Sequence, residues 1–319
     1  MKGLQVLVTG ATGLVGEAVV FRLLLDKRYT PVAAVRATTR LSGLCRIVPF
    51  DLELPTGMPE LRGIDVIVHC AARVHVMNEK GADGLAAFRK INVEGTVRLA
   101  RRAAECGVKR FIFISSIKVN GEGTPRNKTF KATDLPAPVD AYGISKREAE
   151  DALRQVCEET GMELVVIRPP LVYGPGVKAN FLSMVRWLDR GIPLPLGAID
   201  NRRSLVAIGN LTDLVLTCID HPAAAGEIFL VSDGEDLSTT QLLRRTALAL
   251  GKSARLVPVP AGLLQAAASM VGKSGIAERL CGNLQVDIQR TCELLGWRPP
   301  INTEKALRQT VEHYRDETR

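Results

Sequence analysis

Residues 4–16 read LQVLVTGATGLVG, and this stretch sets the fold at the beginning of the chain. Its first five residues predict a buried strand, and the apolar sequence at Leu14–Leu25 predicts a helix. Gly10 permits the tight turn between them, Gly13 lets the backbone approach a pyrophosphate, and Gly16 allows helix and strand to pack closely. The first turn of such a helix offers free N–H groups and the positive end of its dipole to a phosphate. The stretch therefore predicts a dinucleotide-binding strand–helix unit.

Alternating strand-like and helical segments extend this unit into an α/β fold with a doubly wound parallel sheet. The strand-like runs lie at residues 4–9, 31–36, 45–49, 65–70, 111–115, 164–168 and 227–231. The strongest helical stretches between them are 85–106 and 142–160. Strands that alternate with helices in this way predict helices on both faces of the sheet.

Beyond residue 168 the alternation breaks up. Pro and Gly interrupt the segment 169–203, a strand-like run returns near 204–208, and the remaining segments are mainly helical. We therefore expect two parts in the fold. They are a Rossmann domain made of residues 1–168 and about 204–232, and a smaller, discontinuous C-terminal substrate lobe made of residues 169–203 and 233–319.

Tyr142 and Lys146, in the sequence YGISK, lie downstream of the pair Ser115-Ser116. An i, i+4 pair shares one face of a helix. An ammonium group beside a tyrosine lowers the pKa of the phenol from its ordinary value of about 10 toward the working range. Ser116 is suited to hold the same substrate oxygen by a hydrogen bond, with Ser115 as the alternative. The Tyr–Lys spacing alone is also typical of a solvated helix face, but its place after a nucleotide site favours a catalytic group for redox chemistry at an oxygen-bearing carbon.

The residue at the end of the second strand indicates which dinucleotide is bound. An acidic residue there would accept hydrogen bonds from the ribose hydroxyls of NAD, whereas this chain has Arg36, with Arg40 close behind. A guanidinium group matches a 2′-phosphate in charge and in geometry. The sequence therefore favours NADP(H) as the cofactor. NAD(H) is the alternative, because Arg36 could instead stack on the adenine or point into solvent.

Two short segments that follow later strands are expected beside the same cofactor. Asp51-Leu52 comes after the strand at 45–49 and is suited to contact the adenine. Cys70-Ala71-Ala72 offers small side chains where the backbone must run beside the dinucleotide. Both segments leave the carboxyl ends of strands, where ligands of parallel sheets bind.

Taken together, the motifs resemble those of an extended short-chain dehydrogenase/reductase of the NAD-dependent epimerase/dehydratase family. The matching sequences are TGATGLVG at 9–16, HCAA at 69–72, INVEGT at 91–96, SSIKVNG at 115–121, YGISK at 142–146, RPPLVYGPG at 168–176 and RSLVAIGNLTD at 203–213. Within that family the chain is similar to bacterial nucleotide-sugar 4-epimerases and 4-keto reductases of polysaccharide synthesis. The resemblance implies cofactor contacts from the motif residues Gly10, Thr12, Gly13, Leu14, Val15, Asn92, Tyr142, Lys146, Pro169 and Val172.

The second half of the chain resembles nucleotide-sugar enzymes at the positions that bind the substrate diphosphate. By that resemblance Asn180 contacts the diphosphate and Arg203 clamps it, since a guanidinium pairs with phosphate through two hydrogen bonds. Arg202 is the neighbour that competes for this role. Arg279 is followed by LCGNLQVD instead of the usual Pro-Gly-Asp, so its contact with substrate stays open. Whether His75, in the loop after HCAA, contacts the sugar also stays open.

Residues that are absent narrow the reaction. The dehydratases that resemble this chain carry an Asp-Glu pair directly after the catalytic hydroxyl residue, whereas Ile117 and Lys118 follow Ser116 here. The deoxysugar epimerase-reductases place a cysteine in the same loop, and this chain has none between Cys106 and Cys157. The resemblance then leaves hydride transfer at C4 of a nucleotide-diphosphate sugar.

Three functions are compatible with these residues. We expect first a 4-reductase that uses NADPH on a UDP-linked 4-keto-6-deoxy sugar in cell-surface polysaccharide synthesis. The alternative is a UDP-sugar 4-epimerase with tightly bound NAD, which needs the same Ser116, Tyr142 and Lys146. The third is a non-catalytic dinucleotide-binding sensor, which the complete Tyr–Lys pair disfavours.

The composition is that of an ordinary globular protein, with 46% hydrophobic and 24% charged residues among 319. The net charge of +8 comes from dispersed Lys and Arg, and only 4% of residues are aromatic, so we expect anionic nucleotide ligands and no nucleic acid. The seven cysteines form no CxxC pair, which predicts a reducing cytoplasm and no metal site. The beginning of the chain is unlike a signal peptide, and no apolar run approaches the ~20 residues of a membrane span.

The apolar residues of three predicted helices indicate what these helices pack against. The uncharged, Ala-rich pattern near 261–271 is expected in the core or in an interface rather than as a membrane anchor. The helices near 85–106 and 142–160 carry apolar stripes that pack against a second subunit in the family this chain resembles. We therefore expect a homodimer through these helices, with packing on their own sheet as the alternative.

Overall fold

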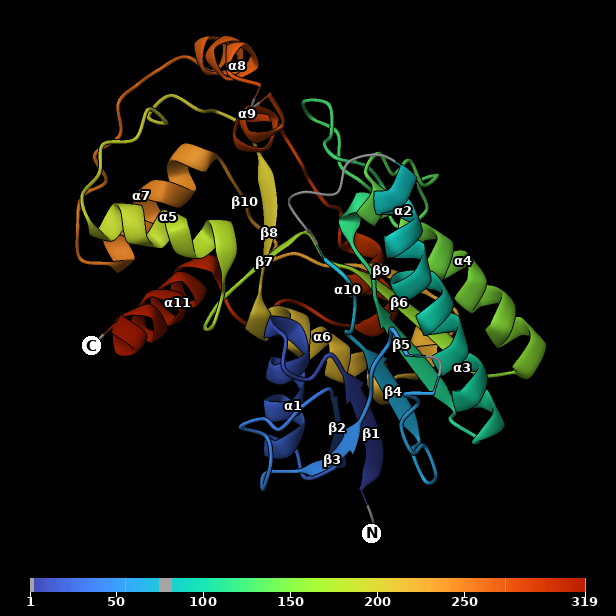
Figure 1. Cartoon of the computed structure of the whole chain (residues 1–319). Helices are drawn as coiled ribbons and strands as arrows, with labels where there is room; N and C mark the ends of the chain where they lie inside the picture. Colours follow the sequence, from blue (N-terminus) through green and yellow to red (C-terminus); the bar gives the residue numbers. More distant parts are fainter. Residues whose placement is uncertain (1–2, 55, 75–81, 273, 319) are drawn as a thin grey trace.

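The structure, a computed structural model, describes residues 3–54, 56–74, 82–272 and 274–318 (Figure 1). In these residues a seven-stranded parallel sheet has the strand order β3-β2-β1-β4-β5-β6-β9. The strands are β1 (Leu4–Thr9), β2 (Tyr29–Val35), β3 (Arg46–Pro49), β4 (Val66–His69), β5 (Arg110–Ile114), β6 (Glu163–Arg168) and β9 (Ile228–Leu230). The strand order reverses direction between β1 and β4, and the carboxyl ends of strands beside such a point form the ligand crevice of this type of sheet. The predicted doubly wound α/β fold is confirmed.

Helices cover both faces of the main sheet, because successive residues of a strand point to opposite sides. Val6 and Val8 belong to a core that includes α1 (Leu14–Leu25), α6 (Ile208–Asp220) and α10 (Gln289–Leu295). Leu7 belongs to the opposite core. That second core includes α3 (Thr96–Glu105) and α4 (Ala141–Thr160), which lie side by side in Figure 1.

The helical stretch expected at 85–106 consists of three parts. α2 (Ala82–Phe88) leads into a π-helical segment, η1 (Arg89–Gly95), and α3 follows without a loop. A π turn contains one residue more than an α turn and is frequent at functional sites. Here it carries Asn92, which is buried, and it ends at Gly95. A Cβ on Gly95 would lie 2.6 Å from the carbonyl oxygen of Leu52, so glycine allows the segment after β3 to pack directly on this helix.

A three-stranded sheet follows the carboxyl end of β6. In it, β8 (Arg203–Ala207) pairs in parallel with β7 (Leu171–Tyr173) and antiparallel with β10 (Asp236–Leu237). The helices that share its core are α5 (Ala179–Asp189), α7 (Thr239–Ala249) and α11 (Thr303–Thr318). β8 thus lies in the small sheet, whereas α6 and β9, which follow it, belong to the main layers. The boundary expected between the two domains stays a prediction.

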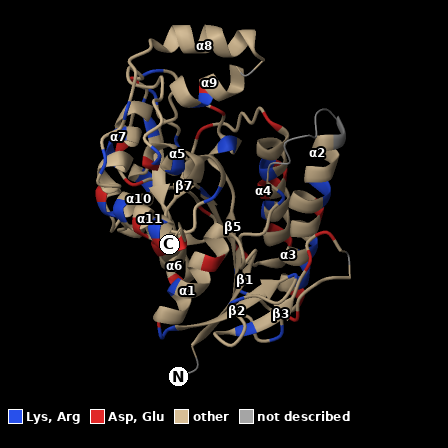
Figure 2. Ribbon diagram, turned by 60° about the vertical axis from the view of Figure 1, so that its left-hand side comes forward, with Lys and Arg blue, Asp and Glu red and all other residues tan. Residues whose placement is uncertain are grey.

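The uncharged helix α8 (Ala261–Met270) lies outside the core. It packs on α9 (Ser274–Cys281), and none of its residues, all of which the structure describes, is buried. Both views show it at the edge of the molecule, and in Figure 2 it carries no charged residue. The expectation of a core position for 261–271 is therefore wrong. Within the described ranges no helix is long and apolar enough to cross a bilayer.

Candidate active site

The turn between β1 and α1 forms a cradle that a larger residue would fill. Gly10 has a φ of +63°, and a Cβ there would lie 2.7 Å from the amide nitrogen of Ala71. A Cβ on Gly16 would lie 2.2 Å from the carbonyl oxygen of Gly10. Gly13 is the N-cap of α1, and among the described side chains none caps this helix. The exposed turn at Thr12 and Gly13 therefore leaves the helix terminus open for an anion, which fits the pyrophosphate of a dinucleotide.

The residues expected at the adenosine end lie at the ends of β2 and β3. Arg36 is exposed and has no hydrogen bond or ion pair within residues 3–54, 56–74, 82–272 and 274–318. Arg40 is bound to Glu17 of α1, with 2.6 Å between Nε and Oε1. Asp51 is half-buried and accepts a hydrogen bond from its own loop, the amide of Glu53. Leu52 packs against Gly95. Because Arg40 is paired with Glu17, the guanidinium of Arg36 is the unpaired cation among these residues at the ends of β2 and β3.

A buried histidine fixes the loop after β4. His69 lies between Thr9 and Thr96, at 2.7 Å from Nδ1 to the Thr9 Oγ1 and 3.0 Å from Nε2 to the Thr96 Oγ1. Thr9 Oγ1 also accepts a hydrogen bond from the amide of Ala71, so both threonine hydroxyls and this amide belong to one network around the ring. Burial, with the positive charge of Lys146, lowers the pKa of His69 to about 3. The ring is therefore neutral and serves as a fixed support.

Sequence reasoning missed this threonine–histidine–threonine network. The available signal was the presence of polar residues at the ends of two otherwise apolar strands, Thr9 on β1 and His69 on β4. The network holds the amide of Ala71 beside the glycine turn. Of the neighbouring small residues, Ala72 is half-buried, and burial raises the pKa of the Cys70 thiol to about 12. Cys70 is thus a neutral thiol at neutral pH.

Asn92 joins the same loop to α4. Its Oδ1 accepts the amide of Arg73 at 2.8 Å, and its Nδ2 donates to the Arg73 carbonyl and to Ser145 Oγ, at 3.1 and 3.0 Å. Ser145 directly precedes Lys146. The amide of Asn92 is thereby committed to the protein. Its predicted role toward the cofactor stays a prediction, and the geometry supports a role in placing the loop and α4.

The two serines at the end of β5 have different surroundings. Ser115 is buried, and its Oγ donates a hydrogen bond to the Glu150 carboxylate. Ser116 is half-buried, and its Oγ accepts the amide of Lys118 at 3.3 Å, at the start of the 3₁₀ turn η2 (Ile117–Val119). The proton of Ser116 is free for another acceptor. This difference favours Ser116 over Ser115 as the group that meets a substrate oxygen.

The carboxylate of Glu150 belongs to a buried ion pair. Arg168, at the end of β6, donates from Nε and Nη2 to Glu150, and its Nη1 donates to Asn120 Oδ1 at 3.0 Å. Both charged side chains are 2% exposed. Removal of one partner from such a pair costs about 3–5 kcal/mol, because a buried charge is left alone. The pair therefore fastens α4 to β6, and Ser115 adds the end of β5.

The start of α4 is fastened to the turn that carries Ser116. Asp140 caps the helix by accepting the amide of Gly143 at 2.7 Å, and its carboxylate also pairs with Lys118 of η2. A Cβ on Gly143 would lie 2.9 Å from the carbonyl oxygen of Lys118. Tyr142 lies between Asp140 and Gly143 in the chain, and its ring packs edge-on against that of Phe88, with 6.1 Å between the ring centroids. These contacts bring Tyr142 and Ser116 to the same end of the sheet.

Lys146 lies one turn further along α4. It is 2% exposed, and its Nζ lies 4.0 Å from the ring centroid of Phe113. Among the described residues its ammonium group has no hydrogen-bond acceptor. Burial lowers the pKa of Lys146 to about 7, against the opposing effects of Glu150 and Cys70. A buried ammonium without an acceptor is the feature expected of a residue that binds hydroxyl groups of a ligand.

The pKa of Tyr142 differs from the sequence-based expectation. Burial, and then the charge of Asp140, raise the pKa of this phenol above its ordinary value. Lys146 does not contribute to this shift, so the expected lowering of the Tyr142 pKa by that lysine is absent. A phenolate at this position therefore requires additional positive charge or hydrogen bonds from bound ligands.

Two arginines approach each other on the side of the small sheet. Arg203 starts β8, and its Nη1 donates to the carbonyl of Gly282 at 3.1 Å. Burial lowers the pKa of Arg203, and the nearby Arg279 guanidinium lowers it further, whereas Glu122 raises it. Arg202 is exposed. Arg203 and Arg279 together therefore offer a cationic site that Glu122 partly balances.

The remaining predicted residues lie around this region. Asn180 is exposed in the first turn of α5 and makes no hydrogen bond with any other described residue. Pro169 is buried, and its carbonyl accepts the amide of Ile117. Val172 is half-buried in β7. Leu14 and Val15 are half-buried at the start of α1. His75 falls outside the described residues.

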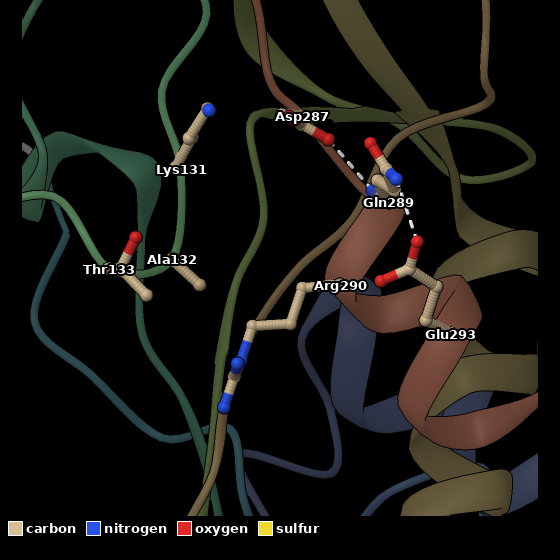
Figure 3. Close-up of a pocket in the computed structure, with 7 residues that line it drawn as sticks. All are labelled: Lys131, Ala132, Thr133, Asp287, Gln289, Arg290 and Glu293. Carbon is tan, nitrogen blue, oxygen red and sulfur yellow. Dashed lines mark hydrogen bonds between the residues drawn. The ribbon is translucent and has the colours of Figure 1, made fainter.

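A cavity of about 170 Å³ lies elsewhere on the molecule, between the loop after Phe130 and α10 (Figure 3). Its lining residues are Lys131, Ala132, Thr133, Asp287, Gln289, Arg290 and Glu293. Arg290 is engaged with Glu227 at 2.8 Å. None of the predicted site residues lines this cavity, so it plays no part in the site.

The burial of Lys146 predicts a pH-dependent stability difference. The lysine pKa falls from the ordinary 10.5 to about 7 on folding, so the unfolded chain binds the additional proton between these values, and stability falls as the pH falls through this window. Cofactor-free Lys146→Met should therefore be more stable than the wild type at pH 7, by about 1–4 kcal/mol. Its advantage should shrink toward pH 10.

Urea unfolding of both proteins at the two pH values measures this difference. Lys305→Met, at an exposed position of α11, is the matched control and should leave stability nearly unchanged at both. A difference between Lys146→Met and the wild type that does not change with pH would contradict a buried lysine with a lowered pKa.

Comparisons with known proteins agree with this geometry. The sequence pattern of the NAD dependent epimerase/dehydratase family matches residues 6–232. A UDP-glucose 4-epimerase from Vibrio cholerae is 50% identical over 317 residues, which cover 97% of this chain and 95% of that protein. An N-acetyl-alpha-D-glucosaminyl-diphospho-ditrans,octacis-undecaprenol 4-epimerase from Escherichia coli O157:H7 is 26% identical over 268 residues, covering 79% of this chain and 78% of that protein.

Solved structures show the same fold. The UDP-glucose 4-epimerase of Thermotoga maritima with UDP-glucose has a TM-score of 0.79 at 23% identity, covering 99% of this chain and 100% of that chain. The UDP-glucuronic acid 4-epimerase of Bacillus cereus with NAD has a TM-score of 0.78 at 19% identity, with the same coverage. From the family match and the 50% identity, the chain is an enzyme of the NAD dependent epimerase/dehydratase family.

Proposed function

We propose that this enzyme is a UDP-sugar 4-epimerase. The observation that carries the proposal is 50% identity over nearly the whole chain to a UDP-glucose 4-epimerase. The placement of Ser116, Tyr142 and Lys146 around the carboxyl end of β5 supports it. The 4-keto reductase, which we expected first, has less support, because the relatives and structural neighbours described above are named 4-epimerases.

The proposed reaction uses the three side chains in a cycle. Bound NAD would accept the hydride of C4 and give it back, and its oxidised form would add positive charge to the site. Tyr142 takes the proton of the C4 hydroxyl as the hydride leaves, and returns it after the 4-keto sugar has presented its other face. Ser116 Oγ donates a hydrogen bond to the same oxygen. Its proton is available because its oxygen accepts only the weak 3.3 Å contact from Lys118.

The buried lysine assists this proton transfer. Lys146 shares the inner face of α4 with Tyr142, and its pKa of about 7 means that its charge responds to ligands near neutral pH. Ribose hydroxyls of the cofactor would provide the acceptors that its ammonium lacks in the protein. An ammonium held there favours the phenolate of Tyr142 and offsets the effect of burial on its pKa. Cofactor binding would therefore lower the pKa of Tyr142 and favour its role as the base.

The substrate diphosphate is assigned to the cationic side of the small sheet. Arg203 is held by the carbonyl of Gly282, which leaves the rest of its guanidinium for phosphate oxygens. Asn180, free and exposed at the start of α5, is the second contact. The proximity of Arg279 to Arg203 favours Arg279 as a third. Two adjacent arginines repel each other until an anion neutralises them.

The cofactor of the proposed cycle is NAD. The family is named as NAD dependent, and the similar structure of the Bacillus cereus UDP-glucuronic acid 4-epimerase is named with NAD. An epimerase also returns the cofactor to its starting state. The preference for NADP(H) drawn from Arg36 has less support. Arg40, the second cation at that edge, is already neutralised by Glu17, so Arg36 alone would have to meet a 2′-phosphate. Stacking of Arg36 on the adenine is the role we assign to it.

A homodimer through α3 and α4 remains part of the proposal. The apolar residues Ala149, Leu153 and Val156 are buried against the enzyme's own sheet, so they are not available to a second subunit. The outer surface of these helices carries ion pairs such as Arg101 with Glu159. A dimer at this face would therefore use polar contacts around the remaining exposed residues.

Replacement of Tyr142 by Phe tests the catalytic assignment. Tyr142→Phe should lower kcat by about 10²–10⁴-fold, the usual contribution of general acid–base catalysis, with cofactor content unchanged. Ser116→Ala should lower kcat without loss of stability. Ser115→Ala is its matched control and should lower stability more than kcat, because it removes a hydrogen bond from buried Glu150. Activity of Tyr142→Phe within about tenfold of the wild type would reject the assignment.

The nucleotide carried by the purified enzyme separates the epimerase from the reductase. We expect NAD(H) to be released only on denaturation, and UDP-glucose to be converted to UDP-galactose without added reductant. Chromatography of the released nucleotide and of the sugar products measures both. Freely exchanging NADPH, consumed in proportion to product, would establish the reductase instead.

Titration calorimetry tests the diphosphate site. UDP should bind to the cofactor-loaded enzyme, and Arg203→Ala should weaken it by about 1.5–3 kcal/mol, the contribution of a charged hydrogen bond. Arg202→Ala, at the exposed neighbouring position, is the matched control and should change UDP binding little. Equal effects of the two substitutions, or no UDP binding by the wild type, would refute the assigned site.

A further inference from the structure

The segment 257–272 and helix α9 form an apolar, exposed projection, which we name the α8–α9 tip. Its exposed large apolar side chains are Val257, Leu263, Met270, Val271, Ile276 and Leu280. Met270 is 82% exposed and Leu263 63%. Segment 257–272 contains no Asp, Glu, Lys or Arg. A helix exposed to water ordinarily carries a charged face, and apolar side chains gathered on a surface mark a site of contact.

The tip is held firmly to the rest of the enzyme at both ends. Before α8, Val257 exchanges backbone hydrogen bonds with the segment 194–197, at 2.8 Å and 2.9 Å. After α9, the carbonyls of Leu280 and Gly282 accept hydrogen bonds from Asn201, and Arg203 also donates to Gly282. The apolar side chains are thus presented on an anchored projection and are not the frayed end of a chain.

The sequence around the tip is basic. Residues 251–281 contain the basic residues Lys252, Arg255, Lys273 and Arg279 and the acidic residue Glu278, a net charge of +3 in the sequence, and Lys252 is paired with Asp189 in the fold. Arg255 and Arg279 are exposed on either side of α8 in the chain. An uncharged apolar centre with basic flanks is complementary to a membrane interface, where acyl chains lie below anionic headgroups.

We propose that the α8–α9 tip docks peripherally on an anionic lipid bilayer. Leu263, Met270 and Ile276 enter the boundary between headgroups and acyl chains, and Arg255 meets lipid phosphates. A second copy of the enzyme fits this surface less well, because a symmetric contact would bring the basic flanks of two tips together. This proposal concerns where the enzyme works and does not depend on the sugar or on the cofactor.

Vesicle sedimentation with the full-length enzyme tests the proposal. Vesicles of phosphatidylglycerol and phosphatidylethanolamine should carry the wild type down, and vesicles of pure phosphatidylcholine should retain at least about fivefold less. The double variant Leu263→Ser, Met270→Ser should lose about tenfold in binding to the anionic vesicles, because it removes apolar groups from the interface. Arg255→Glu, or salt raised from about 0.05 to about 0.5 M, should weaken binding as well.

The double variant Leu25→Ser, Leu248→Ser is the matched control. These two leucines are 78% and 70% exposed on α1 and α7, outside the tip, so their replacement should leave vesicle binding unchanged. Because Leu263 and Met270 are exposed, the tip variant should keep the wild-type melting temperature and sugar turnover in the absence of lipid. Equal binding to phosphatidylcholine, or equal losses in the tip and control variants, would overturn the proposal. So would a lipid-free oligomer that dissociates in the tip variant, which would identify a second copy as the occupant.

Discussion

The active site depends on the buried ion pair between Glu150 and Arg168. It joins α4 to the end of β6, and it reaches Ser115 at the end of β5 and Asn120 beyond η2. Glu150 lies one helical turn after Lys146, which itself lies one turn after Tyr142. The ion pair therefore fixes the position and rotation of the face of α4 that carries these two residues. Two charges enclosed in this way tolerate little displacement, since each would be left unpaired in a nonpolar environment.

Burial also explains why the site requires its ligands. The core that positions Lys146 disfavours its ammonium form, and the same burial disfavours the phenolate of Tyr142. His69, the other basic group beside Lys146, is kept neutral by burial and by the charge of Lys146, and it adds no competing charge. The protein thus provides a rigid frame that favours the neutral forms of both Tyr142 and Lys146. Charge brought by bound ligands then decides when proton transfer becomes favourable.

The small sheet assembles the substrate side from distant segments. β8 brings Arg203 beside α9 with Arg279, and beside the segment after η2 with Glu122. The positive charge of Arg279 disfavours the charged form of Arg203, and an anion bound beside them would offset this effect. The same contacts that hold Arg203 and Asn201 on Gly282 also hold the base of the α8–α9 tip. The proposed diphosphate site and the exposed apolar surface therefore share one structural support.

The sequence alone determined the parallel sheet, the glycine turn with its open helix terminus, and the Tyr–Lys spacing, because each depends on local periodicity or on the absence of a side chain. It preferred Ser116 and kept Ser115 as the alternative, and it placed the helix at 261–271 in the core or in an interface. Tertiary structure supplies a reason to prefer Ser116, because Ser115 is engaged by Glu150 from another element, and it excludes the core position, because α8 packs only at the edge of the molecule. The expected low pKa of Tyr142 also failed, since neighbouring charge can be read from spacing, whereas desolvation depends on how the whole core closes around the residue.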